Sequence, residues 1–397
     1  MIWTISKTLW LGLKEVVLLK AEAFRKHFPI FRDSVHLCSC SEGALSDRVI
    51  VAMSEFMTSW RTQAAPWESW MEEVDRARQQ FARLIRADEK DVAVVSCASE
   101  GAFHVAWDQD FTKGRSVIVT NDLEFPSVAH VWLAARPRGA DVRFVMQHNG
   151  VVALEDYINA INERVALVSV PLVSYANGFR FPVEDIAKVA HKYGARVVVD
   201  AYQGAGVIPI DVNTLHADYV ISGSLKYLLG SPGMAFLWVR PGIVHGEDPA
   251  LTGWFARSNP FAFTPRVLDY AADARRFQTG TPAIPAAFAA AAGMSLINET
   301  DVHHVFTHIS ALADTLQERV QAEGYHLYSP DQRDQRGPQV TVWADNAEHL
   351  SDYLRKRNIF VSPRGKAVRM SLHFYNNEED IEQVVRTLAD YRNSTRD

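Results

Sequence analysis

Cysteine is scarce in this chain of 397 residues, which contains only Cys38, Cys40 and Cys97. Three thiols cannot build a disulfide framework. The Cys38-x-Cys40 pair has no second pair downstream and is a poor zinc signature, so we expect no metal site. This use of cysteine is typical of a reducing compartment, and we expect the protein to be cytoplasmic.

The sequence also lacks an excess of basic residues and any long apolar run. The formal net charge is -6, so nucleic acid is not an expected partner. Lys7, Lys14 and Glu15 interrupt the apolar N-terminus before it reaches the roughly 18 residues of a membrane span, and no small-residue cleavage site follows. We expect no membrane association and interpret residues 1–33 as an N-terminal helical segment that packs on the body or on a partner subunit.

The apolar pattern indicates an α/β fold with a second, smaller domain. A hydrophobic fraction of 48% in a chain of this length is enough for a large core. Short apolar runs typical of buried strands alternate with helical periodicity. They lie at residues 91–95, 117–120, 142–145, 165–170, 197–199, 219–221 and 234–239. From residue 324 the pattern becomes α+β, with strands expected near residues 325–328, 339–343, 360–362 and 367–372. We expect residues 34–282 to form the large domain, with a mostly parallel sheet between helices, and residues 283–397 to supply interdomain helices and a small α+β domain.

Two of these strands end in residues that can do chemistry. The run 197–199 ends in Asp200, and the run 219–221 leads through small residues into Lys226. In open α/β sheets, ligands bind at the carboxyl edge of the strands. An acid and an amine there suit pyridoxal 5'-phosphate (PLP), because Lys226 can form a Schiff base with its aldehyde and Asp200 can keep its ring nitrogen protonated. An acid that only caps a helix and a solvated lysine are the alternative interpretations.

The motifs around this pair resemble those of the class V aminotransferase superfamily of PLP enzymes, which includes cysteine desulfurases and kynureninases. The resemblance is carried by Asp200-Ala201-Tyr202-Gln203 and by Ser222-Gly223-Ser224-Leu225-Lys226-Tyr227-Leu228, and it extends over residues 35–391. It implies the PLP-transferase fold of type I, a seven-stranded and mostly parallel sheet, and a homodimer with shared active sites. A nicotinamide-dependent oxidoreductase is disfavoured because no G-x-G-x-x-G follows the early strands.

The resemblance also implies a set of binding residues. Residues 96–101 are similar to the family's phosphate-binding turn, with Ser99 where threonine is common and a helix expected to begin near Ala102; Ser99 as a simple N-cap is compatible with this role. The residues implied to bind the cofactor, besides Asp200 and Lys226, are Ala98, Ser99, Phe125, Gln203, Ser222, Ser224 and Thr281. Arg369 is implied to hold the substrate carboxylate, with Tyr175 and Ser41 beside it.

The resemblance predicts the chemistry only in outline. We expect a small α-amino acid to react through the Lys226 Schiff base and a quinonoid, with Lys226 as the base, in an aminotransferase or lyase reaction. Glu124-Phe125-Pro126-Ser127 and Gly253-Trp254-Phe255 are similar to kynureninase and keep β-cleavage open as the alternative. A persulfide-forming desulfurase is disfavoured because Ser362-Pro363-Arg364-Gly365 stands where desulfurases carry a cysteine. A cysteine-independent C-S lyase and a catalytically silent PLP-binding protein stay open.

Overall fold

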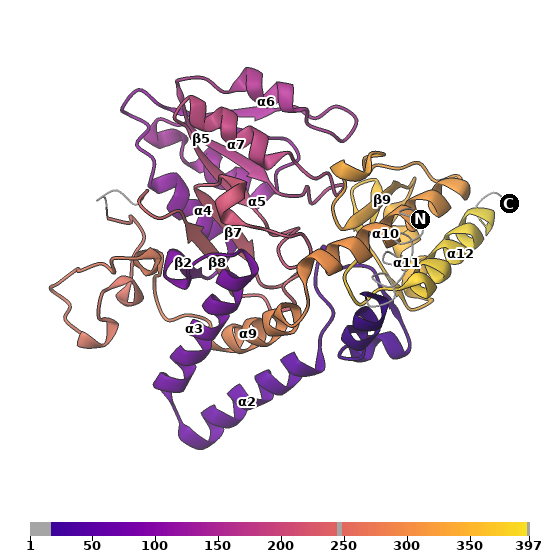
Figure 1. Cartoon of the computed structure of the whole chain (residues 1–397), viewed down its shortest axis with the longest axis horizontal. Coiled ribbons are helices and arrows are strands. Elements are labelled where there is room, and N and C mark those ends of the chain that lie inside the picture. The colour runs from indigo at the N-terminus through magenta and orange to yellow at the C-terminus, as the bar shows by residue number, and fades with distance from the viewer. Residues whose placement is uncertain (1–16, 244–247, 395–397) are drawn as a thin grey trace, which may run out of the picture.

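In the computed structural model, which describes residues 17–243 and 248–394, the chain forms a large α/β body with a smaller α+β part beside it (Figure 1). The predicted N-terminal helix lies partly outside the described residues. Residues 17–25 are helical, and the 3₁₀ helix η1 (Pro29–Arg32) follows. Phe24 and Phe28 are buried, and the Phe28 ring packs edge-on against Tyr375 at 4.8 Å between centroids. The described part of this segment therefore packs on the C-terminal part of the chain.

The body is built on one seven-stranded sheet in the order β2-β8-β7-β6-β5-β3-β4. Its strands are β2 (Val92–Val95), β3 (Val117–Asn121), β4 (Asp141–Val145), β5 (Val165–Pro171), β6 (Arg196–Asp200), β7 (Tyr219–Gly223) and β8 (Ala235–Val239). Only β8 runs antiparallel to its neighbours, β2 and β7. The predicted fold class, with a mostly parallel seven-stranded sheet, is confirmed.

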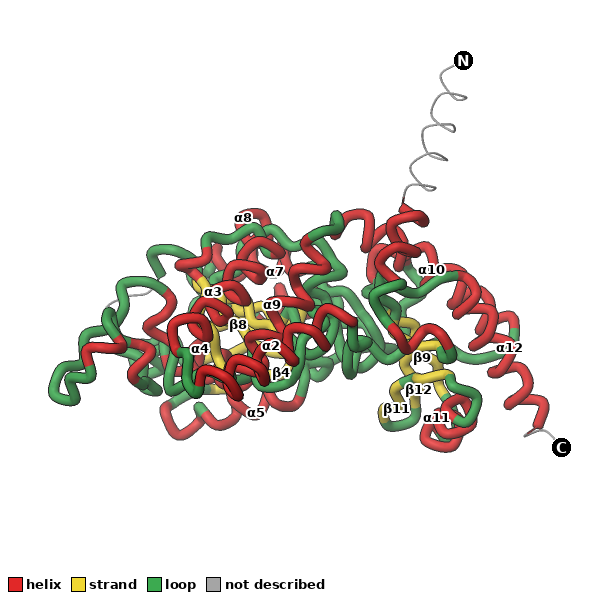
Figure 2. The backbone as a smooth tube through the Cα atoms, turned by 90° about the horizontal axis from the view of Figure 1, so that it is seen from below, coloured by secondary structure: helices red, strands yellow, loops and turns green. Residues whose placement is uncertain are grey.

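Helices cover both faces of this sheet, which is why its strands are apolar without alternation. In β2, Val92 and Val94 join the core cluster of Phe81, whereas Ala93 and Val95 join the core cluster of Trp132 on the other face. The first face carries α3 (Trp67–Leu84), α6 (Leu154–Ala160) and α7 (Val183–Lys192), and the second carries α4 (Ala98–Trp107) and α5 (Pro126–Ala134). Helices α2 (Asp47–Gln63) and α9 (Ile284–Asn298) pack beside α3 (Figure 2), and α8 (Val212–Leu215) is a single turn.

The smaller part contains a three-stranded antiparallel sheet in the order β11-β12-β9. Its elements are α10 (Val302–Ala322), β9 (Gln339–Trp343), α11 (Ala347–Arg355), β10 (Ile359–Phe360), β11 (Ser362–Arg364), β12 (Ala367–Ser371) and α12 (Glu378–Ser394). Strand β1 (Val35–His36) pairs in parallel with β10, which attaches this N-terminal strand to the smaller part. The strand expected at residues 325–328 is wrong: only an isolated bridge joins Leu327 to Val342. The domain boundaries themselves stay a prediction.

The connections hold six further 3₁₀ helices among the described residues. They are η2 (Glu89–Asp91), η3 (Arg136–Arg138), η4 (Trp254–Ala256), η5 (Pro260–Ala262), η6 (Ala274–Phe277) and η7 (Arg333–Gln335). None of the described helices combines the length and the apolar character needed to cross a membrane.

Helix α4 begins four residues earlier than the sequence predicted. Cys97 is its N-cap with extended backbone angles, and Ala98 is its first residue, so the predicted start near Ala102 is wrong. The side chain of Glu100 explains the early start, because it accepts a hydrogen bond from the backbone N–H of Ser96 at 2.7 Å. An acid at the third helical position that reaches back to a preceding N–H stabilises the first turn. Ser99 thus lies inside this turn and is not its N-cap.

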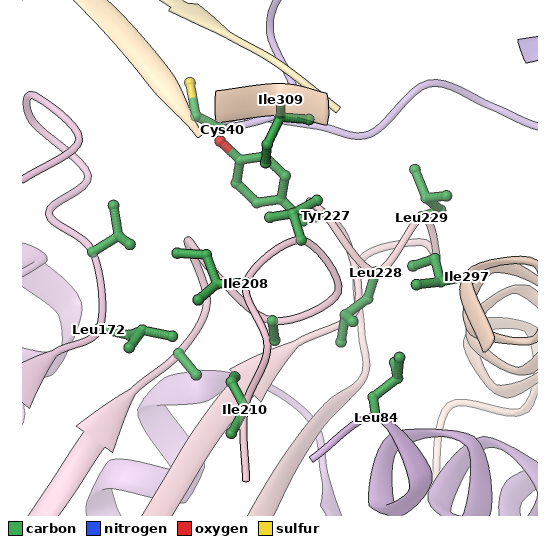
Figure 3. Close-up of a cluster of buried hydrophobic side chains, with 14 of the residues drawn as sticks. Cys40, Leu84, Leu172, Ile208, Ile210, Tyr227, Leu228, Leu229, Ile297 and Ile309 are labelled. Atoms are coloured by element: carbon green, nitrogen blue, oxygen red, sulfur yellow. The ribbon is translucent and has the colours of Figure 1, made fainter. Parts of the chain in front are cut away.

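The chain after Lys226 is anchored in the core of the body. Tyr227, Leu228 and Leu229 are buried, and Figure 3 shows Tyr227 pointing towards Cys40, with Leu228 and Leu229 near Ile297 of α9. The close approach of α9 requires Gly293, because a Cβ atom there would lie 2.4 Å from the carbonyl oxygen of Leu229. This packing fixes the backbone that carries Lys226.

Candidate active site

Asp200 and Lys226 lie at the same edge of the sheet. Strands β6 and β7 are parallel neighbours with Asp200 opposite Ile221, and Lys226 follows the end of β7 by three residues. Burial lowers the pKa of Lys226 from 10.5 to about 8, while the negative charge of Asp200 opposes the shift. Burial also raises the pKa of Asp200, against the effects of a hydrogen bond from the Tyr202 N–H and the charge of Lys226. The structure therefore brings the predicted acid and amine together.

Two aromatic rings enclose the lysine amine. Lys226 Nζ lies 5.3 Å from the ring centroid of Phe125 and 4.3 Å from that of Tyr202. Tyr202 can approach this closely because residue 223 is glycine: a Cβ atom at Gly223 would lie 2.2 Å from Tyr202 Cζ. The sequence predicted that Phe125 stacks on the cofactor ring, but it predicted no role for Tyr202. A tyrosine two residues after the strand-end acid was the available signal.

Glu124 is a second buried acid at this edge, and the sequence motifs predicted no role for it. Its side chain is 4% exposed, and it accepts hydrogen bonds from the Ser169 hydroxyl at 2.8 Å and from the Phe125 N–H at 3.0 Å. Burial and the charge of Asp200 raise the pKa of Glu124 to about 8. At neutral pH the Glu124 carboxyl group therefore holds a proton.

Arg369 on β12 lies fully buried between the two parts of the molecule. Its Nη1 donates to the carbonyl oxygen of Tyr175 at 2.7 Å, and its Nη2 donates to the Ser41 hydroxyl at 3.0 Å. The Ser41 hydroxyl is also 2.8 Å from that of Ser362 on β11. The Arg369 Nε is buried without a hydrogen-bond partner among the described residues, so the guanidinium keeps a donor for a further ligand. The three predicted substrate residues, Arg369, Tyr175 and Ser41, are thus in contact.

A loop from the N-terminal part closes over the lysine. The Gly43 N–H donates to the carbonyl oxygen of Leu225 at 3.1 Å, and a Cβ atom at Gly43 would lie 2.3 Å from the carbonyl oxygen of Lys226. Gln203 Nε2 donates to the carbonyl oxygen of Cys40 in the same loop at 3.0 Å. The other amide atom, Gln203 Oε1, is buried with no partner among the described residues.

The remaining predicted cofactor residues differ in their surroundings. Ala98 and Ser99 form the first turn of α4, whose free N–H groups favour an anion. Ser224 is buried, and its hydroxyl lies 2.8 Å from the Ser231 carbonyl oxygen, so it bonds to the turn before β8. Ser222 is buried at the end of β7, with its hydroxyl 3.3 Å from the Gly223 carbonyl oxygen, and Thr281 is exposed. The two serine hydroxyls therefore bond to backbone oxygens of β7 and of the turn before β8.

These observations fit PLP. A half-buried lysine with a lowered pKa can hold an aldehyde, Asp200 can face a ring nitrogen, and Phe125 offers a ring to stack on the cofactor. The unpartnered Gln203 Oε1 and the N-terminus of α4 leave polar groups for the ring substituents and the phosphate. Within the described residues, no group of three or more metal-binding side chains occurs. The fold and this site define an enzyme that binds an aldehyde cofactor at the edge of a parallel sheet.

Comparisons with known proteins agree with this class. The model of the aminotransferase class-V family matches residues 39–384. The chain is 34% identical over 369 residues to the uncharacterized aminotransferase YcbU of Bacillus subtilis, with 93% of this chain and 97% of the relative covered. It is 29% identical over 302 residues to a kynureninase of Pseudomonas fluorescens, covering 72% and 70% of the two chains. The chain belongs to the class V aminotransferase family, which confirms the predicted family, enzyme class and PLP cofactor.

The solved structures support the fold. A cysteine desulfurase from Thermococcus onnurineus superimposes with a TM-score of 0.84 at 23% identity, covering 93% of this chain and 97% of that chain. A cystine C-S lyase, C-DES, gives 0.83 at 20% identity, with 91% and 99% covered. At this level of identity the likeness concerns the fold and not the reaction.

Proposed function

We propose that the chain is a PLP-dependent aminotransferase or lyase that acts on a small α-amino acid and uses Lys226 to hold the cofactor and to move the proton on Cα. The observation that carries this proposal is the half-buried Lys226 beside Asp200, with its amine between the rings of Phe125 and Tyr202. A pKa of about 8 leaves part of the amine neutral near pH 7, and a neutral amine can take up a proton.

Each of the other residues has a role in this proposal. When bound, PLP supplies an electron-accepting ring. Asp200 holds the charge opposite the ring nitrogen, and Phe125 stacks on the ring. Arg369 grips the substrate carboxylate, a task suited to its planar fork of donors and to the free Nε. The cofactor's other contacts are assigned to Ala98, Ser99, Gln203, Ser222, Ser224 and Thr281.

A kynureninase-like cleavage is the second candidate. It is favoured by the motifs Glu124-Phe125-Pro126-Ser127 and Gly253-Trp254-Phe255, which are similar to those of kynureninase, and by the kynureninase relatives. Formation of alanine and anthranilate from kynurenine would decide for this reaction. A cysteine-independent C-S lyase and a catalytically silent PLP-binding protein are the remaining alternatives.

A desulfurase that forms a persulfide on its own cysteine is the least favoured reaction. Strand β11 and the turn after it carry Ser362, Pro363, Arg364 and Gly365 and no thiol. Cys38 and Cys40 lie on the loop over the lysine, but burial raises the pKa of Cys38 to about 12. A thiol with this pKa is protonated at neutral pH and is a poor acceptor for sulfur, because the thiolate is the nucleophile. All three cysteines are free in the structure, consistent with the reducing cytoplasm that we propose.

A homodimer with shared active sites is part of the proposal. Apolar side chains are exposed on α2 and on the segment after β8, which projects from the body in Figure 1: Ile50, Val51, Met57, Trp60, Leu251, Phe261, Phe263, Val267 and Leu268. The ring contact between Trp67 and Trp254, at 6.2 Å, joins the segment after β8 to the start of α3. Gly253 packs against Thr279, two residues before the exposed Thr281. A second copy bound to this surface would bring Thr281 of one chain towards the phosphate site of the other. Light scattering of the wild-type protein should give a molecular mass of twice that of one chain. The Phe263→Asp variant should give the mass of a single chain.

The experiment for the proposed function detects the covalent bond between Lys226 and the cofactor. Wild-type protein loaded with PLP should show the visible absorbance of a lysine-bound cofactor, and borohydride reduction should fix the cofactor to the peptide that contains Lys226. Lys226→Ala should lose both signals. Lys188→Ala, which removes an exposed lysine paired with Glu184, is the matched control and should keep them. An unchanged spectrum in Lys226→Ala would refute the assignment. Titration of wild type with a panel of amino acids, with analysis of products, separates transfer from elimination.

A further inference from the structure

A hairpin of the small sheet places a second arginine beside Arg369. Strands β11 and β12 pair with Ser362 opposite Arg369 and Arg364 opposite Ala367. Directly opposed residues in an antiparallel pair share a face, and so do residues two apart on one strand. The side chains of Ser362, Arg364 and Arg369 therefore lie on the same face of the sheet, with Arg364 about 7 Å further along the strand than Ser362.

This face of the hairpin is the one that borders the site. The Ser362 hydroxyl lies 2.8 Å from that of Ser41, which in turn accepts from Arg369. The opposite face carries Val368, which is buried in the core. The two-residue turn has Gly365 at φ +58°, which suits the first central position of a type II′ turn. The turn thus holds the end of β11, and Arg364 with it, at the rim of the site.

The positive charge of Arg364 has no role in stabilising the described fold. Its side chain is exposed and makes no hydrogen bond or ion pair with any residue that the structure describes. Its positive charge reaches the lysine, where it contributes with that of Arg369 to lowering the pKa of Lys226. The acids near this rim are Asp200, which is buried against the lysine, and the exposed Glu42, whose charge acts on Cys38. Arg364 therefore offers a guanidinium to a ligand bound by Arg369.

We propose that Arg364 binds a second anionic group of the substrate, so that the enzyme prefers α-amino acids with a carboxylate in the side chain over neutral ones of the same size. This inference rests on the proposed function and narrows its substrate class. Arg369 holds the α-carboxylate, and Arg364 lies two residues further along the hairpin, within reach of a charged group two or three bonds beyond Cα. The Arg364 guanidinium is exposed to water in the free protein, so pairing with such a group costs little desolvation energy. The two groups can form a bidentate pair of hydrogen bonds.

The test compares acids with their neutral amides, which have nearly the same shape. The affinities of the PLP-loaded protein for aspartate, asparagine, glutamate and glutamine are measured by spectral titration. Wild type should bind at least one acid roughly 10- to 100-fold more tightly than its amide, the range of a charge-assisted hydrogen bond. Arg364→Gln should remove this preference and leave the amide affinity within about twofold. Arg364→Lys should keep part of it, and Arg355→Gln, which removes an exposed arginine paired with Asp352, should keep all of it.

A second measurement does not require an acidic amino acid as ligand. Because the charge of Arg364 lowers the pKa of Lys226, Arg364→Gln should shift the pH titration of the lysine-bound cofactor absorbance to higher pH. Equal affinity of wild type for acids and amides, or equal losses of both in Arg364→Gln, would overturn this inference alone. A wild type that binds PLP through Lys226 but responds to no amino acid would overturn the proposed function and this inference with it.

Discussion

The replacement Glu124→Gln should remove a large pH-dependent part of the stability of the folded chain. Glu124 is buried, and its pKa is raised from 4.5 to about 8 by burial and by the charge of Asp200. Between these two pH values the folded protein holds a proton that the unfolded chain has released. The stabilisation from this proton is fully present below about pH 4.5 and is lost as the pH rises through about 8.

The size of the effect follows from the shift. Each pH unit within the window should lower the free energy of unfolding by about 1.4 kcal/mol, so the full shift corresponds to roughly 5 kcal/mol as an upper limit. Glutamine is neutral at every pH, and its Oε1 can still accept from the Phe125 N–H while its Nε2 donates to the Ser169 hydroxyl oxygen, so the variant should lack this slope. We expect the stability of wild type relative to Glu124→Gln to fall by several kcal/mol from pH 5 to pH 8.5.

The assay is urea unfolding of the cofactor-free protein at several pH values, followed by tryptophan fluorescence. The difference between variant and wild type is the quantity to use, because other groups titrate in the same range. His36 and His373, for example, have pKa values lowered to about 4 by burial, which makes stability rise with pH in the acid range. Glu184→Gln, which replaces an exposed carboxylate paired with Lys188, is the control and should run parallel to wild type. Parallel curves for wild type and Glu124→Gln would refute the reasoning.

Three further replacements test the site and its support. Gly223→Ala puts a Cβ atom 2.2 Å from Tyr202 Cζ, so we expect a lower melting temperature and a loss of lysine-bound cofactor absorbance. Arg369→Lys leaves one point charge in place of a planar fork, and we expect the KM for the amino acid to rise at least about tenfold in steady-state assays, with a smaller change in kcat. Asp380→Ala removes the buried partner of Arg25, bonded at 2.8 Å, and urea unfolding should show a destabilisation of about 3–5 kcal/mol, with Asp380→Asn less affected.

The sequence predicted the central part of the site because that part depends on local patterns. Buried parallel strands appear as apolar runs, and the carboxyl ends of neighbouring parallel strands meet at one edge of the sheet. Asp200 and Lys226 each follow such a run, so the sequence alone indicates that they lie close together. The start of α4 was harder, because Ser99 and Cys97 are both acceptable near an N-cap and the choice depends on the side chain of Glu100.

The outer part of the site could not be predicted from local patterns. Ser41 and Ser362 are 321 residues apart and meet because β1 pairs with β10, two strands of two residues each. Strands this short have no measurable periodicity. Tyr202 was visible in the sequence, but its place above Lys226 depends on the absence of a side chain at Gly223. Contacts of this kind are set by tertiary packing, and propensity and pattern do not determine them.

Burial shifts the pKa values of two groups at this site in opposite directions. It lowers the pKa of Lys226 and raises that of Glu124, and both values come to about 8, because a low dielectric disfavours a positive and a negative charge alike. Burial raises the pKa of Asp200 as well, but this carboxyl group faces the lysine amine. Arg369 donates hydrogen bonds to two oxygens. Under the proposed function this divides the work: Asp200 and Arg369 orient charged groups of the ligands, and Lys226 moves the proton while Glu124 holds Phe125 in place through its backbone N–H.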